Sequence, residues 1–140
     1  MTLTDTAEDE DRKIEAAAST TIYVCITCRR AGDPEKGVCP GLLLARETAR
    51  AAEGTGVAVR QVRCLANCSR ALSAAIRRDG AWTYVFGGLD VDTDAAALIE
   101  GARLFARATD RLMPWRGRPD ILKRGLIARV PPMDYEEESE

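Results

Sequence analysis

The fold of this chain is decided by residues 21–64, whose sequence is TIYVCITCRRAGDPEKGVCPGLLLARETARAAEGTGVAVRQVRC. The stretch opens on alternating polar and apolar side chains, and residues 57–63, VAVRQVR, have the same strand-like character. Between them, residues 41–53 place apolar side chains on one helical stripe, and glycines at 54 and 56 provide a stop. The stretch therefore predicts a strand, a crossover helix and a second strand.

Two cysteines mark the ends of these predicted strands. Cys25 closes the first strand, and Cys64 follows the second. Strands that are joined by a crossover helix are usually parallel neighbours, so their carboxyl ends meet at one edge of the sheet. We expect Cys25 and Cys64 to lie at that edge.

The next stretch, SAAIRRDGAWTYVF at 73–86, predicts a β-hairpin with Asp79 and Gly80 in its turn. Its return strand places three aromatic side chains on one face: Trp82, Tyr84 and Phe86. We interpret these side chains as core or interface residues rather than as a ligand-binding cluster.

A last amphipathic helix is expected after a cap at Asp92 or Thr93. Its apolar stripe consists of Ala95, Leu98, Ile99, Ala102, Phe105 and Ala106. Residues 111–132, RLMPWRGRPDILKRGLIARVPP, contain four prolines that limit this segment to at most a short helix. We expect the segment to wrap the body or to contact a partner. The order β-α-β followed by β-β-α predicts a thioredoxin-like α/β fold.

The charge distribution divides the chain into a basic body between acidic ends. Residues 1–20 hold six acids and two bases with few large apolar groups, and are expected to be a disordered tail. Residues 131–140 hold five acids and no base, whereas residues 21–130 hold 18 bases and 11 acids. We expect one domain over 21–110, followed by an extension over 111–140 that ends in acidic residues.

The composition favours a cytoplasmic protein without a membrane anchor. The apolar stretches fall short of the roughly 20 residues that a membrane span needs, and the start, MTLTDTAEDEDRK, lacks the apolar core of a signal peptide. The basic body offers few aromatic side chains and no nucleic-acid-binding motif. Acidic protein partners are therefore a better expectation than nucleic acid.

The chain has five cysteines and no histidine. The cytosol keeps thiols reduced and an odd count leaves one unpaired, so metal or redox chemistry is a better interpretation than structural disulfides. Cys25 and Cys28 form a C-x-x-C pair, and Cys64 and Cys68 form a C-x-x-x-C pair. Without histidine, the sensible occupants are an iron–sulfur cluster and a tetrahedral zinc ion. A thioredoxin-type redox pair is disfavoured because CITC is followed by RRAGDPEKG, which breaks regular structure instead of opening a helix.

The cysteine-bearing loops carry a resemblance to a known family. VC at 24–25 is followed by RR, G-x-P and K-G-x-C, then by C-L-x-x-C at 64–68 and DGAWTYVFGGL at 79–89. This run resembles the thioredoxin-like [2Fe-2S] ferredoxins over roughly residues 21–107. The stretches CITCR, CLANCSR, WTYVFG, PWRGRP and IARVPP are also similar to a bacterial family known mainly as predicted metal-binding proteins and often linked with cobalamin biosynthesis.

The ferredoxin resemblance implies which thiolates hold a cluster. Matched position by position, the ligands are Cys25, Cys39, Cys64 and Cys68. The gap after the first ligand is longer than usual in that family, and Cys28 has no counterpart there, so Cys28 is an alternative to Cys39. Cys39 is preferred because it immediately precedes the predicted helix, whose amino terminus stabilises a thiolate.

The implied function is that of an electron carrier with a [2Fe-2S] cluster, not of an enzyme. Basic side chains beside the cysteines are expected to raise its reduction potential: Arg29, Arg30, Arg63 and Arg70. The implied partner is a redox protein with an acidic docking face. Such ferredoxins are typically dimers, and the aromatic face of residues 82–86 could serve as the interface. The alternative, from a different class, is a zinc-binding interaction or metal-delivery protein that serves the cobalamin pathway.

Overall fold

The computed structural model describes residues 19–29, 32 and 37–140 of the chain. At its centre is a five-stranded sheet in the order β2-β1-β3-β4-β5. The strands are β1 (Thr20–Cys25), β2 (Ala58–Val62), β3 (Ala74–Arg78), β4 (Thr83–Phe86) and β5 (Leu126–Val130). Thr20 is fully buried and begins β1. The acidic tail that we expected lies, over residues 1–18, outside the described residues.

The predicted β-α-β unit and the predicted hairpin are both confirmed. Helix α2 (Pro40–Ala52) connects β1 to β2, and these two strands pair in parallel with Cys25 opposite Val62. β1 also pairs antiparallel with β3, and β3 pairs antiparallel with β4. The parallel pair therefore brings the carboxyl ends of β1 and β2 to the same edge of the sheet.

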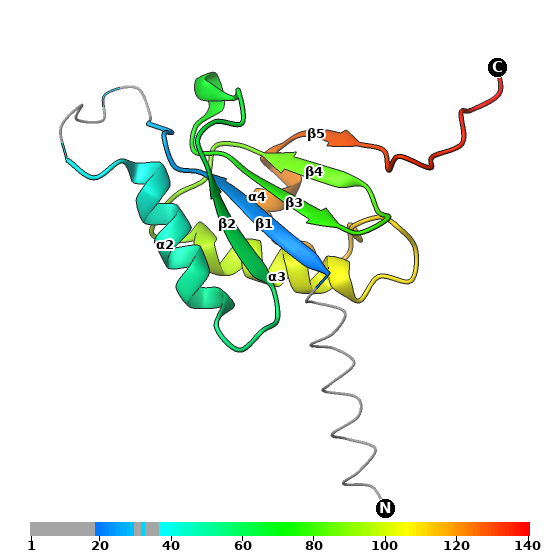
Figure 1. Cartoon of the computed structure of the whole chain (residues 1–140), viewed down its shortest axis with the longest axis horizontal. Coiled ribbons are helices and arrows are strands. Elements are labelled where there is room, and N and C mark those ends of the chain that lie inside the picture. Colours follow the sequence, from blue (N-terminus) through cyan, green and yellow to red (C-terminus); the bar gives the residue numbers. More distant parts are fainter. Residues whose placement is uncertain (1–18, 30–31, 33–36) are drawn as a thin grey trace, which may run out of the picture.

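The helices cover one face of the sheet and leave the other face open (Figure 1). Helix α2 and helix α3 (Asp94–Ala106) pack against each other and against β1. The side chains between the sheet and the helices are fully buried: Ile22, Val24, Leu44, Ile76, Phe86, Leu98 and Phe105. Burial of each large apolar side chain contributes about 1.5–3 kcal/mol, so this single layer is the main source of stability.

Residues 111–132 contain the short helix that we expected and, in addition, a strand that we did not predict. Helix α4 (Ile121–Arg124) is that short helix, but Leu126–Val130 form β5, which pairs antiparallel with β4. The prolines of the segment lie before and after β5, not within it, so they remove no amide from the ladder. The segment is thus part of the sheet.

Two of the three aromatic side chains of residues 82–86 belong to the chain's own core, in agreement with the prediction of core or interface residues. Tyr84 is 2% exposed and Phe86 is 0% exposed. The Tyr84 ring meets the Phe105 ring of α3 edge to face, with ring centroids 5.3 Å apart. Trp82 is half-buried, and its ring contacts that of Tyr135 at a centroid distance of 5.3 Å.

Helix α3 begins where it was predicted, but not through a side-chain cap. Thr93 occupies the N-cap position without a side-chain hydrogen bond to the helix amides. Instead, the Asp94 carboxylate accepts hydrogen bonds from the Asp90 amide at 2.6 Å and from the Thr93 hydroxyl at 3.1 Å. These bonds tie the start of α3 to the loop before it.

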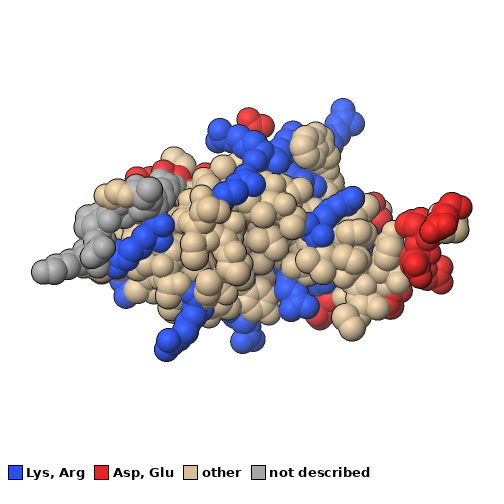
Figure 2. All heavy atoms as spheres, turned by 90° about the horizontal axis from the view of Figure 1, so that it is seen from above, with Lys and Arg blue, Asp and Glu red and all other residues tan. Residues whose placement is uncertain are grey.

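Charge is unevenly distributed over the molecule. Figure 2 shows the acidic C-terminal segment gathered at one end, with basic side chains spread over the body. An ion pair between Arg111 and Asp134, with Nη2 and Oδ1 2.5 Å apart, ties the start of that segment to the body. Over the described part of the chain, no helix has the length and apolar character to span a membrane.

Candidate metal centre

Cys25 lies where the sequence predicts it, at the edge of the sheet where the parallel strands β1 and β2 both end. It is the last residue of β1 and is 2% exposed. Its thiol donates a hydrogen bond to the carbonyl oxygen of Arg63 at 3.5 Å, and the Thr27 hydroxyl donates to the same oxygen. Because Cys64 follows Arg63 directly, these bonds hold the loops of Cys25 and Cys64 side by side.

Cys28 and Cys39 lie where the first cysteine loop enters α2. Cys39 is the N-cap residue of α2, and its thiol donates a hydrogen bond to the Cys28 carbonyl oxygen at 2.9 Å. The Gly41 amide donates to the same oxygen at 3.1 Å. A Cβ atom on Gly41 would lie 2.2 Å from the Cys25 carbonyl oxygen, so α2 can approach the loop this closely only with glycine here.

The second cysteine loop is more exposed than the first. The sulfur of Cys64 accepts a hydrogen bond from the Ala66 amide at 3.1 Å. Cys68 begins a short 3₁₀ helix, η1 (Cys68–Arg70), and both cysteines are exposed. The loop is anchored through Gly88, whose amide donates to the Arg70 carbonyl oxygen at 2.8 Å. Two thiols are thus presented to the surface on an anchored loop.

Ser73 links the two cysteine loops. It is fully buried, and its carbonyl oxygen accepts a hydrogen bond from the Cys25 amide at 3.1 Å. Its hydroxyl accepts a hydrogen bond from the side-chain amide of Asn67 at 2.9 Å and also contacts the Cys28 thiol. Through Ser73, the loop that carries Cys68 is connected to the loop that carries Cys28.

The two buried thiols have pKa values shifted in opposite directions. Burial, a hydrogen bond with Cys25 and the negative charge of the Cys25 thiolate raise the pKa of Cys28 to about 12. Burial also opposes ionisation of Cys25, but hydrogen bonds from Cys28 and Thr27 outweigh it and leave the pKa of Cys25 below its ordinary value. Of the two thiols, Cys25 is therefore the one that loses its proton first as the pH rises.

The basic residues expected near the cysteines are only partly described. Arg63 and Arg70 are exposed, and Arg29 is half-buried with its Nη2 atom 3.4 Å from the Gly37 carbonyl oxygen. Arg30 lies outside the described residues. Arg29 thus follows Cys28 on the first cysteine loop, and Arg63 and Arg70 are exposed on either side of Cys64 and Cys68 in the sequence.

The chemistry of these donors fits an all-thiolate centre. All five cysteines are free thiols, and the chain offers no imidazole as a competing ligand. Within the described ranges, no three cysteine or carboxylate side chains already stand together as metal ligands. The contacts above join Cys25, Cys28 and Cys39 closely, whereas Cys64 and Cys68 are joined to them through backbone carbonyls and Ser73.

Sequence reasoning missed Gly41 and Ser73. The sequence does contain an indication for Gly41: glycine is a poor helix former, so a glycine in the first turn of a helix suggests that another part of the chain packs closely against it. The sequence contains no such indication for Ser73, because its role depends on contacts that only the folded chain brings together.

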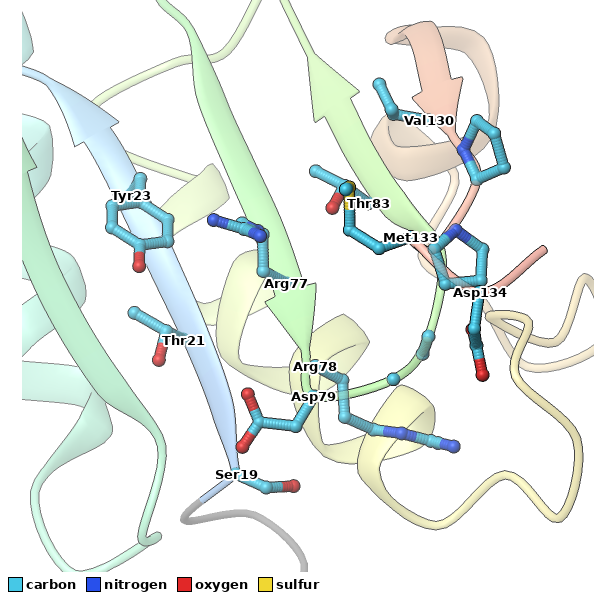
Figure 3. A pocket seen from close by; sticks show the side chains of 14 residues that line it. Ser19, Thr21, Tyr23, Arg77, Arg78, Asp79, Thr83, Val130, Met133 and Asp134 are labelled. Carbon is cyan, nitrogen blue, oxygen red and sulfur yellow. The ribbon is translucent and has the colours of Figure 1, made fainter.

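Two hollows lie on the face of the sheet that the helices leave open. A cavity of about 460 Å³ lies on this face. Its lining includes Tyr23 of β1, Arg77 of β3 and Thr83 of β4 (Figure 3). A neighbouring hollow of about 400 Å³ is mainly apolar and is lined by Val62, Leu65, Ala75 and Val85, among others. Leu65 follows Cys64 directly, so this hollow reaches the second cysteine loop.

Comparison with solved structures defines the class of fold. The chain is similar to a thioredoxin-like [2Fe-2S] ferredoxin from Aquifex aeolicus, with 16% identity, a TM-score of 0.52, and 83% of this chain and 97% of that chain covered. A structure of the wild-type thioredoxin-like [2Fe-2S] ferredoxin from the same organism aligns with 14% identity, a TM-score of 0.45, and 78% and 96% coverage. The fold is thioredoxin-like, as the order of elements predicts.

The family is defined by a sequence match. The model of the family described as Protein of unknown function (DUF1636) matches residues 22–132, and the chain belongs to this family. The match extends through β5 and therefore includes the segment 111–132. No curated protein matches the chain.

Proposed function

We propose that this protein is an electron carrier that holds a [2Fe-2S] cluster through Cys25, Cys39, Cys64 and Cys68. The observation that carries the proposal is the set of free thiols on the loops at one edge of a thioredoxin-like sheet, in a chain without histidine. Thiolate sulfur is the usual protein ligand of such clusters. The likeness to a fold that is described for a [2Fe-2S] ferredoxin supports the same cofactor here.

Each protein element has a task in this proposal. The cluster, when bound, supplies reversible one-electron chemistry. The close contact at Gly41 fixes the start of α2 against Cys25, and Cys39 is the N-cap residue of that helix. Cys28, the alternative ligand, is interpreted as a thiol of the same loop that does not bind. No substrate chemistry is assigned to the chain.

We further propose that a redox protein with an acidic docking face binds at the edge that carries the cysteines. Arg63 and Arg70 are exposed beside Cys64 and Cys68, and would attract carboxylates on the partner. The apolar hollow that begins at Leu65 would provide the uncharged part of the contact. The rate of electron transfer to such a partner should fall as ionic strength rises, because salt screens long-range attraction.

The cofactor is tested by metal and sulfide analysis of protein that has been purified without oxygen. We expect equal amounts of iron and acid-labile sulfide, visible absorption, and an electron paramagnetic resonance signal after reduction. A colourless protein with stoichiometric zinc would contradict the proposal. That result would instead support a zinc-binding interaction or metal-delivery protein.

A further inference from the structure

A cavity of about 440 Å³ lies between β4, β5 and the loop at 110–118. The loop follows α3, at the end of the molecule away from the cysteine loops (Figure 1). We call this cavity the Arg118 cleft, and its lining includes Tyr84, Met113, Trp115, Arg118 and Arg129. Its volume lies within the range of about 300–1,000 Å³ that is usual for small-molecule sites.

Arg118 brings a buried positive charge into the cleft. The residue is 7% exposed. Its Nε atom donates to the Pro114 carbonyl oxygen at 3.1 Å, and Nη2 donates to that of Met113 at 2.5 Å. The guanidinium carbon lies 5.4 Å from the centroid of the Tyr84 ring and 5.2 Å from that of Trp115. All of these partners are neutral.

The buried charge of Arg118 has no counter-ion in the chain as described. Among the residues that the structure covers, no carboxylate forms an ion pair with this guanidinium. Asp110, which also lines the cleft, accepts a hydrogen bond from the Leu112 amide at 3.1 Å instead. A charge that is removed from water costs free energy unless an opposite charge compensates it.

Other cations add to this positive charge. Burial and the charge of Arg129 both lower the pKa of Arg118, although contacts with Tyr84 oppose the effect. The Lys123 ammonium lies 5.1 Å from the centroid of the Trp115 ring. The charged side chains that line the cleft are Arg118, Arg129 and Asp110, so the lining carries a net positive charge.

We propose that the Arg118 cleft binds a small molecule through a carboxylate or phosphate group, which lies against Arg118 and Arg129. A guanidinium forms paired hydrogen bonds with either oxyanion, and burial strengthens them because water is excluded. Trp115, 61% exposed, offers an apolar surface for the remainder of the molecule beside the charged group. This site is independent of the metal centre.

The test uses the purified full-length protein at constant ionic strength. Inorganic phosphate, pyrophosphate and citrate are titrated separately, and binding is followed by the indole resonances of the two tryptophans in ¹H–¹⁵N NMR spectra. We expect saturable binding of at least one of these probes. The phosphate probes and citrate distinguish a phosphate ligand from a carboxylate ligand.

Matched variants separate a site from general charge attraction. Arg129→Gln should weaken binding about tenfold, because it removes a charged hydrogen-bond donor from the lining. Arg124→Gln removes the same charge from an exposed position outside the lining and should change affinity less than about twofold. Equal losses in the two variants would contradict the proposal.

Two further outcomes would overturn it. Absence of saturable binding by all three probes would show that Arg118 serves only to hold the loop at 110–118. Binding of a peptide with the sequence of residues 134–140, DYEEESE, without binding of the small probes would assign the cleft to a polypeptide segment. Neither outcome bears on iron content, so this test is separate from that of the metal centre.

Discussion

At the scale of single residues, Gly41 decides how closely α2 approaches the first cysteine loop. A Cβ atom there would lie 2.2 Å from the Cys25 carbonyl oxygen and 3.1 Å from the Cys28 amide nitrogen. Both neighbours are backbone atoms of buried cysteines, so neither can shift without a cost in free energy. The short distance from Cys25 to the start of the helix therefore depends on the missing side chain.

We predict that Gly41→Ala lowers the free energy of unfolding by about 2 kcal/mol, as overpacking does, and also lowers the iron content per chain. The helix start must shift away from Cys25, which separates Cys39 from the other ligands. Thermal unfolding and iron analysis measure the two effects. Ala51→Ser, at an exposed position of the same helix, is the control and should change neither quantity appreciably. Normal iron content in the Gly41 variant would show that the loop tolerates the shift.

The choice between Cys28 and Cys39 also belongs to the residue scale. Cys39 is the N-cap residue of α2 and is only partly buried, whereas Cys28 is buried beside Cys25 and Ser73. We predict that Cys39→Ser weakens or alters the cluster and that Cys28→Ser leaves its visible and paramagnetic spectra almost unchanged. The opposite result would change the ligand set to Cys25, Cys28, Cys64 and Cys68.

At the scale of elements, the segment after α3 is part of the sheet and not an appendage. The Tyr84 hydroxyl of β4 accepts a hydrogen bond from the Met113 amide at 2.8 Å, and both residues are 2% exposed. This bond joins the loop at 110–118 to the centre of the fold. β5 then completes the sheet beside β4.

We predict that Tyr84→Phe lowers the free energy of unfolding by about 1–2 kcal/mol, because it leaves the buried Met113 amide without a partner. Urea denaturation measures the change, and hydrogen exchange of the Met113 amide should become faster. Tyr23→Phe, a half-buried tyrosine on the open face, is the matched control and should cost less than about 0.5 kcal/mol. Equal costs in the two variants would mean that the bond to Met113 contributes nothing specific.

The sequence alone predicts those helices, strands and turns whose patterns lie within a few neighbouring residues. The alternation in TIYVC, the helical stripe before Gly54 and the Asp79-Gly80 turn each lie within a few residues, and the structure confirms all three elements. β5 was missed because an edge strand between prolines has only a weak pattern of its own, and its partner β4 is distant in the chain. The roles of Gly41 and Ser73 were missed for the same reason, since both depend on tertiary contacts.

At the scale of the whole molecule, the two proposed sites lie at opposite ends of the sheet. The cysteine loops follow β1 and β2, and the loop that follows α3 lies on the other side of the molecule (Figure 1). The Arg118 cleft is lined by that second loop and by β4 and β5. Arg63 and Arg70 are exposed on the second cysteine loop, and the acidic C-terminal segment gathers at one end of the molecule (Figure 2). We therefore expect Arg63 and Arg70 to contribute a positive field at Cys64 and Cys68.

A charge reversal near the cysteines tests this field in the cluster-loaded protein. The cluster with its thiolates is negatively charged and gains one more negative charge on reduction, so a nearby cation stabilises the reduced form. Arg63 is exposed next to Cys64, and its carbonyl oxygen already contacts the Cys25 thiol. We predict that Arg63→Glu lowers the reduction potential by about 20–60 mV, and less at high salt.

The control for this prediction applies the same change of charge far from the cysteines. Arg107, exposed at the carboxyl end of α3, is the position for it, and Arg107→Glu should shift the potential by only a few millivolts because salt screens distant charges. Redox titrations followed by visible absorption compare the two variants at low and high ionic strength. Equal shifts would mean that only the net charge of the protein matters. An unchanged potential in Arg63→Glu would mean that this side chain points away from the cluster, and that Arg29 or Arg70 has to account for any positive field there.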